Sequence, residues 1–391
     1  MHNPYGRSRG ATRRSITAVA AYPPLHGRLF FYIIQFIVSC ASILARRHAR
    51  FDQGLSAMLQ QTANEACAKP RLIFAAAVVG SLMAPASAQV QVQIFPSDMS
   101  WGVGPPFSNE QNAGSNISGT ACTSIPPRAC LAVNDSSNFA QFFAVGARRI
   151  RPTDLIPLQP NQVGQLTFSS VGAEGASFDG DHFYVIGSHG QASPASVRSD
   201  FLAFRFRFDA TGPSFPPTLP EVGRSERLRE AITAAAQAGQ FGPSLQSPSD
   251  VAIEGVAVSD RRMFIGLRAP SPANGPFIMA VGAEAVFGTG NLNFGVRALN
   301  LGEGIGIRDL AKISTGILIL TGPSADVAAA PSLFHLTLGT GMVSKLGDIV
   351  QPTDRKAEAL LVLQEDPEFI RFLVMFDGIE NGGPIEYFVP R

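Results

Sequence analysis

Apolar residues along the C-terminal three quarters of the chain alternate with polar ones or form short runs. Residues 201–208 (FLAFRFRF) place an apolar side chain at almost every second position, which is the period of a half-buried β-strand. Other apolar runs end in glycine, at Gly187, Gly266 and Gly322. Gly and Pro interrupt these runs at short intervals, so the pattern predicts many short strands joined by turns.

A short phrase recurs upstream of these runs. Its five copies read ISG, AEGA, IEGV, IRDL and AEAL and are centred on Ser118, Glu174, Glu254, Arg308 and Glu358, at intervals of 56, 80, 54 and 50 residues. A strand–turn–strand unit repeated in this way is typical of a β-propeller. We therefore expect an all-β fold, a single β-propeller of five to six blades.

The 80-residue interval contains the one segment with a helical pattern. Residues 221–239 are rich in Ala, Arg and Glu and end at a glycine, so we expect one helical insertion there. A sixth blade has two candidate places, this interval and a blade assembled from the two termini. Residues 89–95 alternate between polar and apolar side chains and are the candidate for the strand that closes the ring.

Residues 58–88 have the pattern of a secretory signal peptide. A short basic segment with Lys69 and Arg71 precedes an apolar run and an Ala-x-Ala motif, so we expect cleavage after Ala88 and a periplasmic or secreted protein. Residues 1–57 have two interpretations, an over-extended gene start or an N-terminal membrane anchor built on the apolar residues 29–45. The propeller domain is then 89–391, which we expect to be a monomer without stable membrane insertion.

The charge is divided unevenly between these parts. Residues 1–88 contain 10 of the 31 Lys and Arg residues but two of the 30 acidic ones, so residues 89–391 have a net charge of −7. An acidic domain is a poor partner for nucleic acid, whose phosphates require a basic surface. A small-molecule or ion ligand remains compatible with this charge.

Two cysteines remain in the mature chain. Cys122 and Cys130 lie eight positions apart around a turn, and an exported protein would oxidise such a pair, so we expect a disulfide. A metal site is the alternative, but no histidine or third thiol lies nearby in the sequence to complete it.

The repeated phrase also predicts where polar side chains meet. In a propeller blade the first strand begins at the rim where the second strand ends. This rule places Glu174 near His189, Glu254 near Arg268, Arg308 and Asp309 near Ser324, and Glu358 near Asp377, all at one mouth of the central channel.

Three interpretations of this mouth stay open. The carboxylates hold neighbouring blades together through backbone N–H groups, or they bind a ligand or ion, or they take part in catalysis. In a catalytic site, His189 would act as general acid or base beside Glu174 and Glu254. The ligand-binding candidates are Arg268, Arg308, Asp309, Glu358 and Ser324, with the two arginines as an anion clamp.

A metal at this mouth would be held by oxygen donors. Glu174, Glu254, Asp309 and Glu358 are hard ligands, and calcium is the ion that suits them best. The sequence contains no Gly-x-Ser-x-Gly elbow, P-loop or dinucleotide fingerprint, which disfavours those three chemistries. Whether the protein is an enzyme stays open.

The phrases, together with Gly187-Ser-His-Gly, Gly266-Leu-Arg-Ala-Pro and Thr321-Gly-Pro-Ser, resemble a bacterial exported family, the domain of unknown function 3616, over about residues 115–380. More distantly they are similar to esterase-like phytase propellers, which implies a propeller and calcium-assisted phosphoester hydrolysis. The family phrase opens with Asp where this chain has Asn116, Gly172 and Lys356, and these changes remove acidic groups from the mouth. The expected function is an exported ligand- or ion-binding module, with a calcium-assisted phosphoesterase or esterase as the alternative.

Overall fold

The structure is a computed structural model that describes residues 92–126, 129–163, 166–167, 170–189, 201–208, 220–245, 250–324 and 329–391. The interpretations of residues 1–57 and 58–88 lie outside these residues. Among the described residues, no helix has the length and apolar character needed to cross a membrane.

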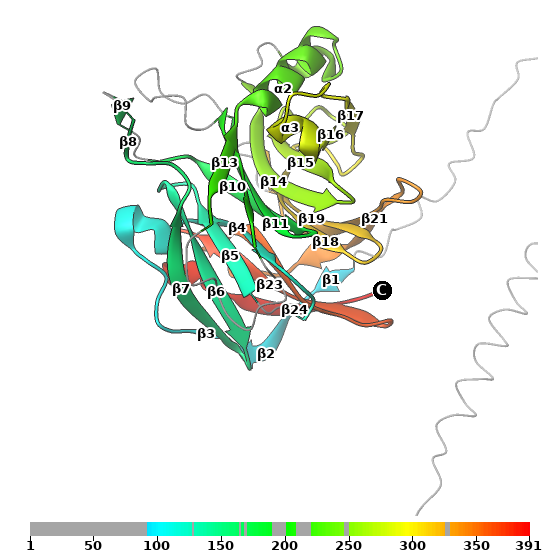
Figure 1. Cartoon of the computed structure of the whole chain (residues 1–391). Helices are drawn as coiled ribbons and strands as arrows, with labels where there is room; N and C mark the ends of the chain where they lie inside the picture. Colours follow the sequence, from blue (N-terminus) through cyan, green and yellow to red (C-terminus); the bar gives the residue numbers. More distant parts are fainter. Residues whose placement is uncertain are drawn as a thin grey trace, which may run out of the picture. The chain divides into compact units, whose positions relative to one another are not determined.

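Five antiparallel sheets form the blades of a β-propeller (Figure 1). Blade 1 contains β4 (Ile117–Cys122), β5 (Ala129–Asn134), β6 (Phe139–Gly146) and β7 (Arg149–Pro157), and blade 2 contains β10 (Ala173–Asp179), β11 (His182–Gly187), β12 (Ala203–Arg207) and β13 (Val222–Ser225). Blade 3 contains β14 (Ala252–Ser259), β15 (Arg262–Ala269), β16 (Phe277–Gly282) and β17 (Phe294–Ala298). Blade 4 contains β18 (Ile305–Ile313), β19 (Gly316–Pro323), β20 (Ser332–Thr337) and β21 (Val343–Ile349), and blade 5 contains β22 (Lys356–Glu365), β23 (Phe369–Asp377) and β24 (Ile385–Pro390).

The ring closes through the innermost strands. These contact one another in the order β4, β10, β14, β18, β22 and back to β4. The all-β propeller is thereby confirmed, with five blades. Neither candidate place for a sixth blade contains one in the described residues, because the 80-residue interval supplies the outer strands of blade 2 and a helix.

Three short N-terminal strands cross the outside of the ring at its closure. β1 (Gln93–Ile94) pairs in parallel with β21 of blade 4, β2 (Pro96–Ser100) pairs with β24 of blade 5, and β3 (Gly102–Val103) pairs in parallel with β7 of blade 1. The last blade is therefore completed from the N-terminus, but by residues 96–100, whereas the described strand within the predicted 89–95, Gln93–Ile94, pairs with blade 4. The alternation of polar and apolar residues predicts that a segment forms a strand. The strand with which that segment pairs depends on which blade edge the segment reaches in the folded protein.

The helical insertion is shorter than the sequence pattern predicts. Helix α2 (Arg227–Gln237) buries Leu228, Ala231, Ile232 and Ala235 against the core of blade 3. The preceding residues form β13 because they pair with the edge of β12. Figure 1 shows α2 beside the short helix α3 (Ala283–Phe287) on the outer side of these blades. The remaining elements are η1 (Glu110–Ser115), η3 (Gly242–Ser244), η5 (Glu380–Gly382), β8 (Gln162–Val163) and β9 (Leu166–Thr167).

The repeated phrase is a β-bulge. In every innermost strand the pairing register shifts at the central residue of the phrase. These residues are Ser118, Glu174, Glu254, Arg308 and Glu358. A bulge adds one unpaired residue and bends the strand, so it re-aims the side chains around it. The same residue is thus presented in the same way by all five blades.

The glycine after the bulge permits close contact between neighbouring blades. A Cβ atom at Gly119 would lie 2.8 Å from the Cα atom of Gly175. A Cβ atom at Gly175 or Gly255 would lie 2.8 Å from the backbone nitrogen of Val256 or Leu310, respectively. These distances are too short for any real side chain, so the innermost strands of blades 1 to 4 approach one another backbone to backbone.

Side-chain hydrogen bonds fasten the same strands together. Asp309 occupies the glycine position in blade 4, and its Oδ2 accepts a bond of 2.8 Å from the N–H of Leu360 in blade 5. Thr120 Oγ1 of blade 1 donates to the Leu360 carbonyl, and Ser177 Oγ of blade 2 accepts from the N–H of Val258 in blade 3. The interpretation that carboxylates hold the ring together therefore fits Asp309.

Cys122 and Cys130 form the predicted disulfide. The two residues face each other in the pairing of β4 with β5, with their Cα atoms 4.0 Å apart. The bridge fixes the base of the first hairpin of blade 1.

Substituting the glycine at a blade contact should loosen the ring. We expect Gly175→Ala to lower the free energy of unfolding by about 1–3 kcal/mol, because its methyl group meets backbone atoms that cannot move alone. Gly295→Ala in β17 is the matched control, since a Cβ atom there has no atom within 4 Å. Urea unfolding measures both, and equal effects of the two substitutions would contradict the close-contact argument.

Candidate functional site

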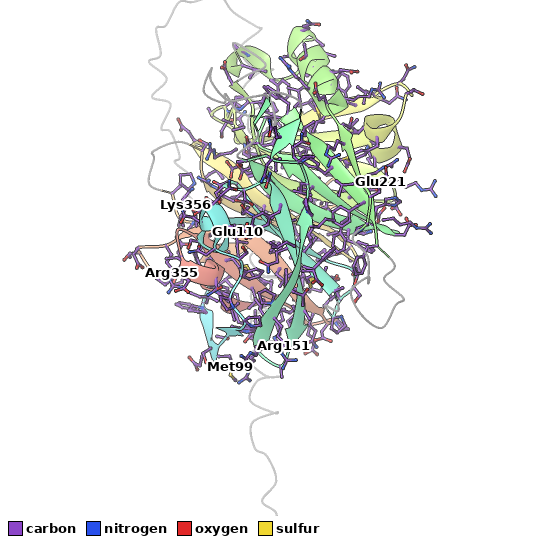
Figure 2. The ribbon with its side chains drawn as sticks, turned by 60° about the vertical axis from the view of Figure 1, so that its left-hand side comes forward. Met99, Glu110, Arg151, Glu221, Arg355 and Lys356 are labelled. Atoms are coloured by element: carbon purple, nitrogen blue, oxygen red, sulfur yellow. A yellow bond between two sulfur atoms is a disulfide. The ribbon has the colours of Figure 1, made fainter. Side chains whose placement is uncertain are left out.

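The bulged residues lie at one rim of the ring, because each innermost strand begins where the second strand of its blade ends. Ala252 pairs with Ala269 and Lys356 with Asp377 in the strand register. Figure 2 shows Lys356 at the beginning of β22 and away from Met99 and Arg151. We refer to Glu174, Glu254, Arg268, Arg308, Lys356 and Glu358 as the charged rim.

Arg308 is the centre of an ion-pair network in this rim. Its side chain is buried, and Nη1 lies 3.1 Å from Oε1 of Glu358 and 3.6 Å from Oε2 of Glu254. Nη2 donates a bond of 2.8 Å to the carbonyl of Pro323. Gly322 makes room for this side chain, since a Cβ atom there would lie 3.1 Å from Cγ and Nε of Arg308. The guanidinium group is thus held between two glutamates.

The network continues at both ends with charges of alternating sign. Arg268 Nη1 lies 2.9 Å from Oε1 of Glu254, which agrees with the neighbourhood that the strand register predicts. At the other end, Lys356 contacts Glu358 and also reaches Asp377, with Nζ 3.3 Å from Oδ2. In the sequence, Lys356 was noted only because it replaces the Asp of the family phrase. Its position opposite Asp377 at the rim could have predicted the ion pair between them.

Electrostatics in the network favour the protonated form of Glu254. Burial, followed by the charge of Glu358, raises the pKa of Glu254 to about 7, although Arg268 and Arg308 oppose the shift. Burial also disfavours the charge of Lys356, but Glu358 outweighs it, so the pKa of Lys356 is raised.

Glu174 stands outside this network. Its carboxylate makes no hydrogen bond or ion pair with any residue that the structure describes. Burial raises its pKa well above the usual value, and the charges of Glu254, Asp135 and Glu358 add to the shift. Asp135 directly follows β5, the second strand of blade 1. It was not selected from the sequence, because the repeated phrase of blade 1 contains no acidic residue to point to that position.

His189 is not hydrogen-bonded to Glu174, although the sequence suggested them as a catalytic pair. Its ring is buried, with Nδ1 3.0 Å from the Gly187 carbonyl oxygen and an edge-to-face contact with Phe201. Nε2 is buried without a partner among the described residues. Burial lowers the pKa of His189 to about 4, so the ring is neutral at pH 7.

Two other predicted ligand-binding residues face protein groups. Both carboxylate oxygens of Asp309 accept backbone hydrogen bonds, from Leu310 and Leu360. The backbone N–H of Ser324 donates to the Gly304 carbonyl, and Arg308 reaches the neighbouring Pro323 instead of Ser324.

The four proposed calcium ligands do not fit a calcium ion in this arrangement. The guanidinium of Arg308 occupies the place between Glu254 and Glu358 that a shared cation would need, and Asp309 is committed to backbone N–H groups. No group of three or more His, Cys, Asp or Glu side chains suited to a metal occurs among the described residues.

The unpaired carboxyl of Glu174 predicts a pH-dependent stability. The pKa of Glu174 in the folded protein is above the unfolded value of 4.5. The stability that the protonated Glu174 carboxyl provides is therefore fully present below about pH 4.5 and is lost as the pH rises through the folded pKa, because ionising this carboxyl costs more in the folded protein than in the unfolded chain. We expect Glu174→Gln to be nearly neutral at pH 4.5 and increasingly stabilising toward pH 8, as measured by urea unfolding.

The control for this measurement is Glu368→Gln, an exposed glutamate in the turn after β22. A stability difference between Glu174→Gln and the wild type that stays constant from pH 4.5 to pH 8 would contradict the burial argument.

Comparison with solved structures yields matches of low similarity. A protein from Lactobacillus plantarum is 12% identical with a TM-score of 0.32, and the match covers 66% of this chain and 64% of that one. The Malassezia sympodialis allergen Mala s 1 is 10% identical, with a TM-score of 0.33 and coverage of 70% and 78%. GH43B of the Bacteroides ovatus xyloglucan PUL is 14% identical, with a TM-score of 0.37 and coverage of 71% and 52%.

The match to this chain covers less than two thirds of the length of the first and third of these proteins. The fold assignment rests on the strand pairing described above and not on these matches. No curated protein sequence matches the chain. The model of a family described as protein of unknown function (DUF3616) matches residues 218–382, in blades 2 to 5. This match confirms the family resemblance at the phrases around Glu254, Arg308 and Glu358.

Proposed function

We propose that the charged rim binds a small ligand with a cationic group and that Glu174 is its main contact. The observation that carries this proposal is the half-buried carboxyl group of Glu174, which has no hydrogen-bond or ion-pair partner among the described residues and lies near two further glutamates. A bound ammonium or guanidinium group would offset the repulsion between these carboxylates and allow Glu174 to ionise.

The arginines support a cationic ligand over an anionic one. Arg308 is buried and already engaged by Glu254, Glu358 and the Pro323 carbonyl, so it has little capacity left for a phosphate. Only Arg268 retains substantial exposure, with 37% of its side chain accessible. An anion clamp made of both arginines would require the network to break.

The hydrolase alternative has weaker support in the same geometry. A general base must reach the proton that it removes, whereas the ring of His189 is buried and bonded to the backbone. Glu174, with its raised pKa, has the property of a general acid, so a hydrolytic reaction stays an outcome that the experiment must distinguish.

Calorimetry with cationic, neutral and anionic probes tests the proposal. We expect spermidine or agmatine to bind more tightly at pH 8 than at pH 5, and binding to release a proton to solvent, because Glu174 loses its proton when a cation binds. Glu174→Gln should weaken this binding at least about tenfold, the effect of losing one charge-assisted hydrogen bond, while Glu368→Gln leaves it unchanged.

The contrary outcomes are distinct. Binding restricted to anions such as phosphate, or binding that Glu174→Gln does not change, would contradict the proposal. Turnover of p-nitrophenyl phosphate or p-nitrophenyl acetate, with or without calcium, that is lost in both Glu254→Gln and His189→Ala would establish the hydrolase in its place.

A further inference from the structure

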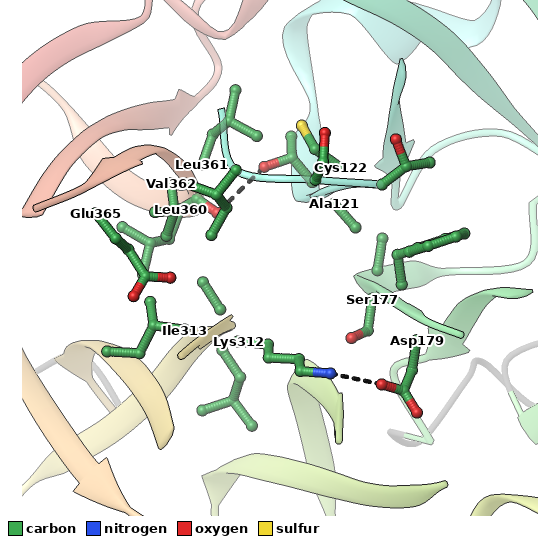
Figure 3. Close-up of a pocket in the computed structure, with 18 of the residues that line it drawn as sticks. Ala121, Cys122, Ser177, Asp179, Lys312, Ile313, Leu360, Leu361, Val362 and Glu365 are labelled. Atoms are coloured by element: carbon green, nitrogen blue, oxygen red, sulfur yellow. Dashed lines mark hydrogen bonds and ion pairs between the residues drawn. The ribbon is translucent and has the colours of Figure 1, made fainter. Parts of the chain in front are cut away.

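A cavity lies at the end of the innermost strands opposite the charged rim. It has a volume of about 350 Å³ and is lined by the last residues of β4, β10, β18 and β22. The bulged residues of the charged rim stand at the beginning of these same strands, so the strand length separates the two places. Figure 3 shows the lining side chains around a central space, which we call the far-end pocket.

Lys312 supplies free hydrogen-bond donors to the far-end pocket. Its Nζ lies 2.5 Å from Oδ1 of Asp179, the dashed contact in Figure 3, and this is its one ion pair among the described residues. An ammonium group has three N–H donors, so two remain. The side chain is 37% exposed and therefore accessible to a ligand. Asp179 is less available, because its Oδ2 already accepts from the N–H of Arg261.

Two hydroxyl groups in the same lining have complementary capacity. Ser177 Oγ accepts a bond from the N–H of Val258, so its own proton is free to be donated. Thr120 Oγ1 donates its proton to the Leu360 carbonyl, so its oxygen is free to accept. The far-end pocket thus offers donors and an acceptor on different walls.

The far-end pocket has no excess of charge. Lys312 and Asp179 form one ion pair, and Glu365 forms another with Arg391 while also accepting from Ser314. Apolar side chains complete the lining, among them Ala121, Ile313, Leu361 and Val362. A charged ligand would therefore gain no net attraction, whereas a neutral molecule with both donors and acceptors would match the lining.

We propose that the far-end pocket binds a small neutral polyhydroxylated molecule, of the size of a monosaccharide or a cyclic polyol. Hydroxyl groups accept and donate at once, so they can accept from Lys312 and Ser177 and donate to Thr120. The carbon skeleton would lie against the apolar walls. The volume is within the range of small-molecule sites in proteins.

The disulfide hairpin forms part of this site. Residues 122–125 line one wall, and the bond between Cys122 and Cys130 holds the base of that hairpin. Reduction should therefore weaken binding in the far-end pocket while leaving the charged rim, at the other end of the strands, unaffected.

Thermal shift and calorimetry with the full chain test the proposal. The probes are glucose, galactose, xylose and myo-inositol, compared with glucuronate, glucose 6-phosphate and glucosamine. We expect at least one of the neutral sugars or myo-inositol to raise Tm and to bind more tightly than the charged sugar derivatives. Lys312→Met should weaken that binding about tenfold, the effect of one lost hydrogen bond from a charged donor.

Lys345→Met is the matched control, because Lys345 forms a similar ion pair of 2.5 Å with Asp348 and is 41% exposed, but lies outside the far-end pocket. If Lys312→Met does not fold, Lys312→Arg retains a cation for Asp179 while displacing the donors, and should still weaken binding. The proposal is overturned if no neutral member binds, if charged relatives bind more tightly, or if the Lys312 variants bind as the wild type does.

Discussion

The close backbone contact between innermost strands is the constraint on which the rest of this structure depends. After each bulge in blades 1 to 3, the next residue lies against the neighbouring blade with no space for a Cβ atom. The innermost strands of all five blades complete the ring, and the bulged residue of each lies near the beginning of its strand, on one rim. Packing of the backbone thus brings the charged residues of the rim together, although the like charges among them repel one another.

The rim resolves this repulsion unevenly. Between blades 3, 4 and 5 the charges alternate, with Arg308 between Glu254 and Glu358, so burial of each charge is offset by a partner. Blade 2 presents Glu174 without such a partner, and the energetic cost is visible as its raised pKa. A group that is costly to ionise in the free protein has most to gain from a ligand, which is why Glu174 carries the proposed function.

The two ends of the innermost strands differ in chemistry for a geometric reason. At the beginning, the bulges turn long charged side chains toward one another, whereas at the end the strands present hydroxyl groups, apolar residues and the paired charges of Lys312 and Asp179 around a cavity of about 350 Å³. One repeated strand therefore yields a crowded charged rim and an open neutral pocket.

The sequence by itself determined the propeller, the disulfide and the rim that unites the phrases, because strand period, cysteine spacing and repeat interval are local properties of the chain. It also indicated that Glu254 and Arg268 are neighbours, since antiparallel pairing fixes that proximity within one blade. Only the tertiary structure decided that Asp309 bonds to blade 5, that Arg308 stands between two glutamates, and that His189 is bonded to the backbone and not to Glu174. These contacts join different blades or depend on burial, and neither the distance between blades nor the exposure of a side chain is written in a local pattern.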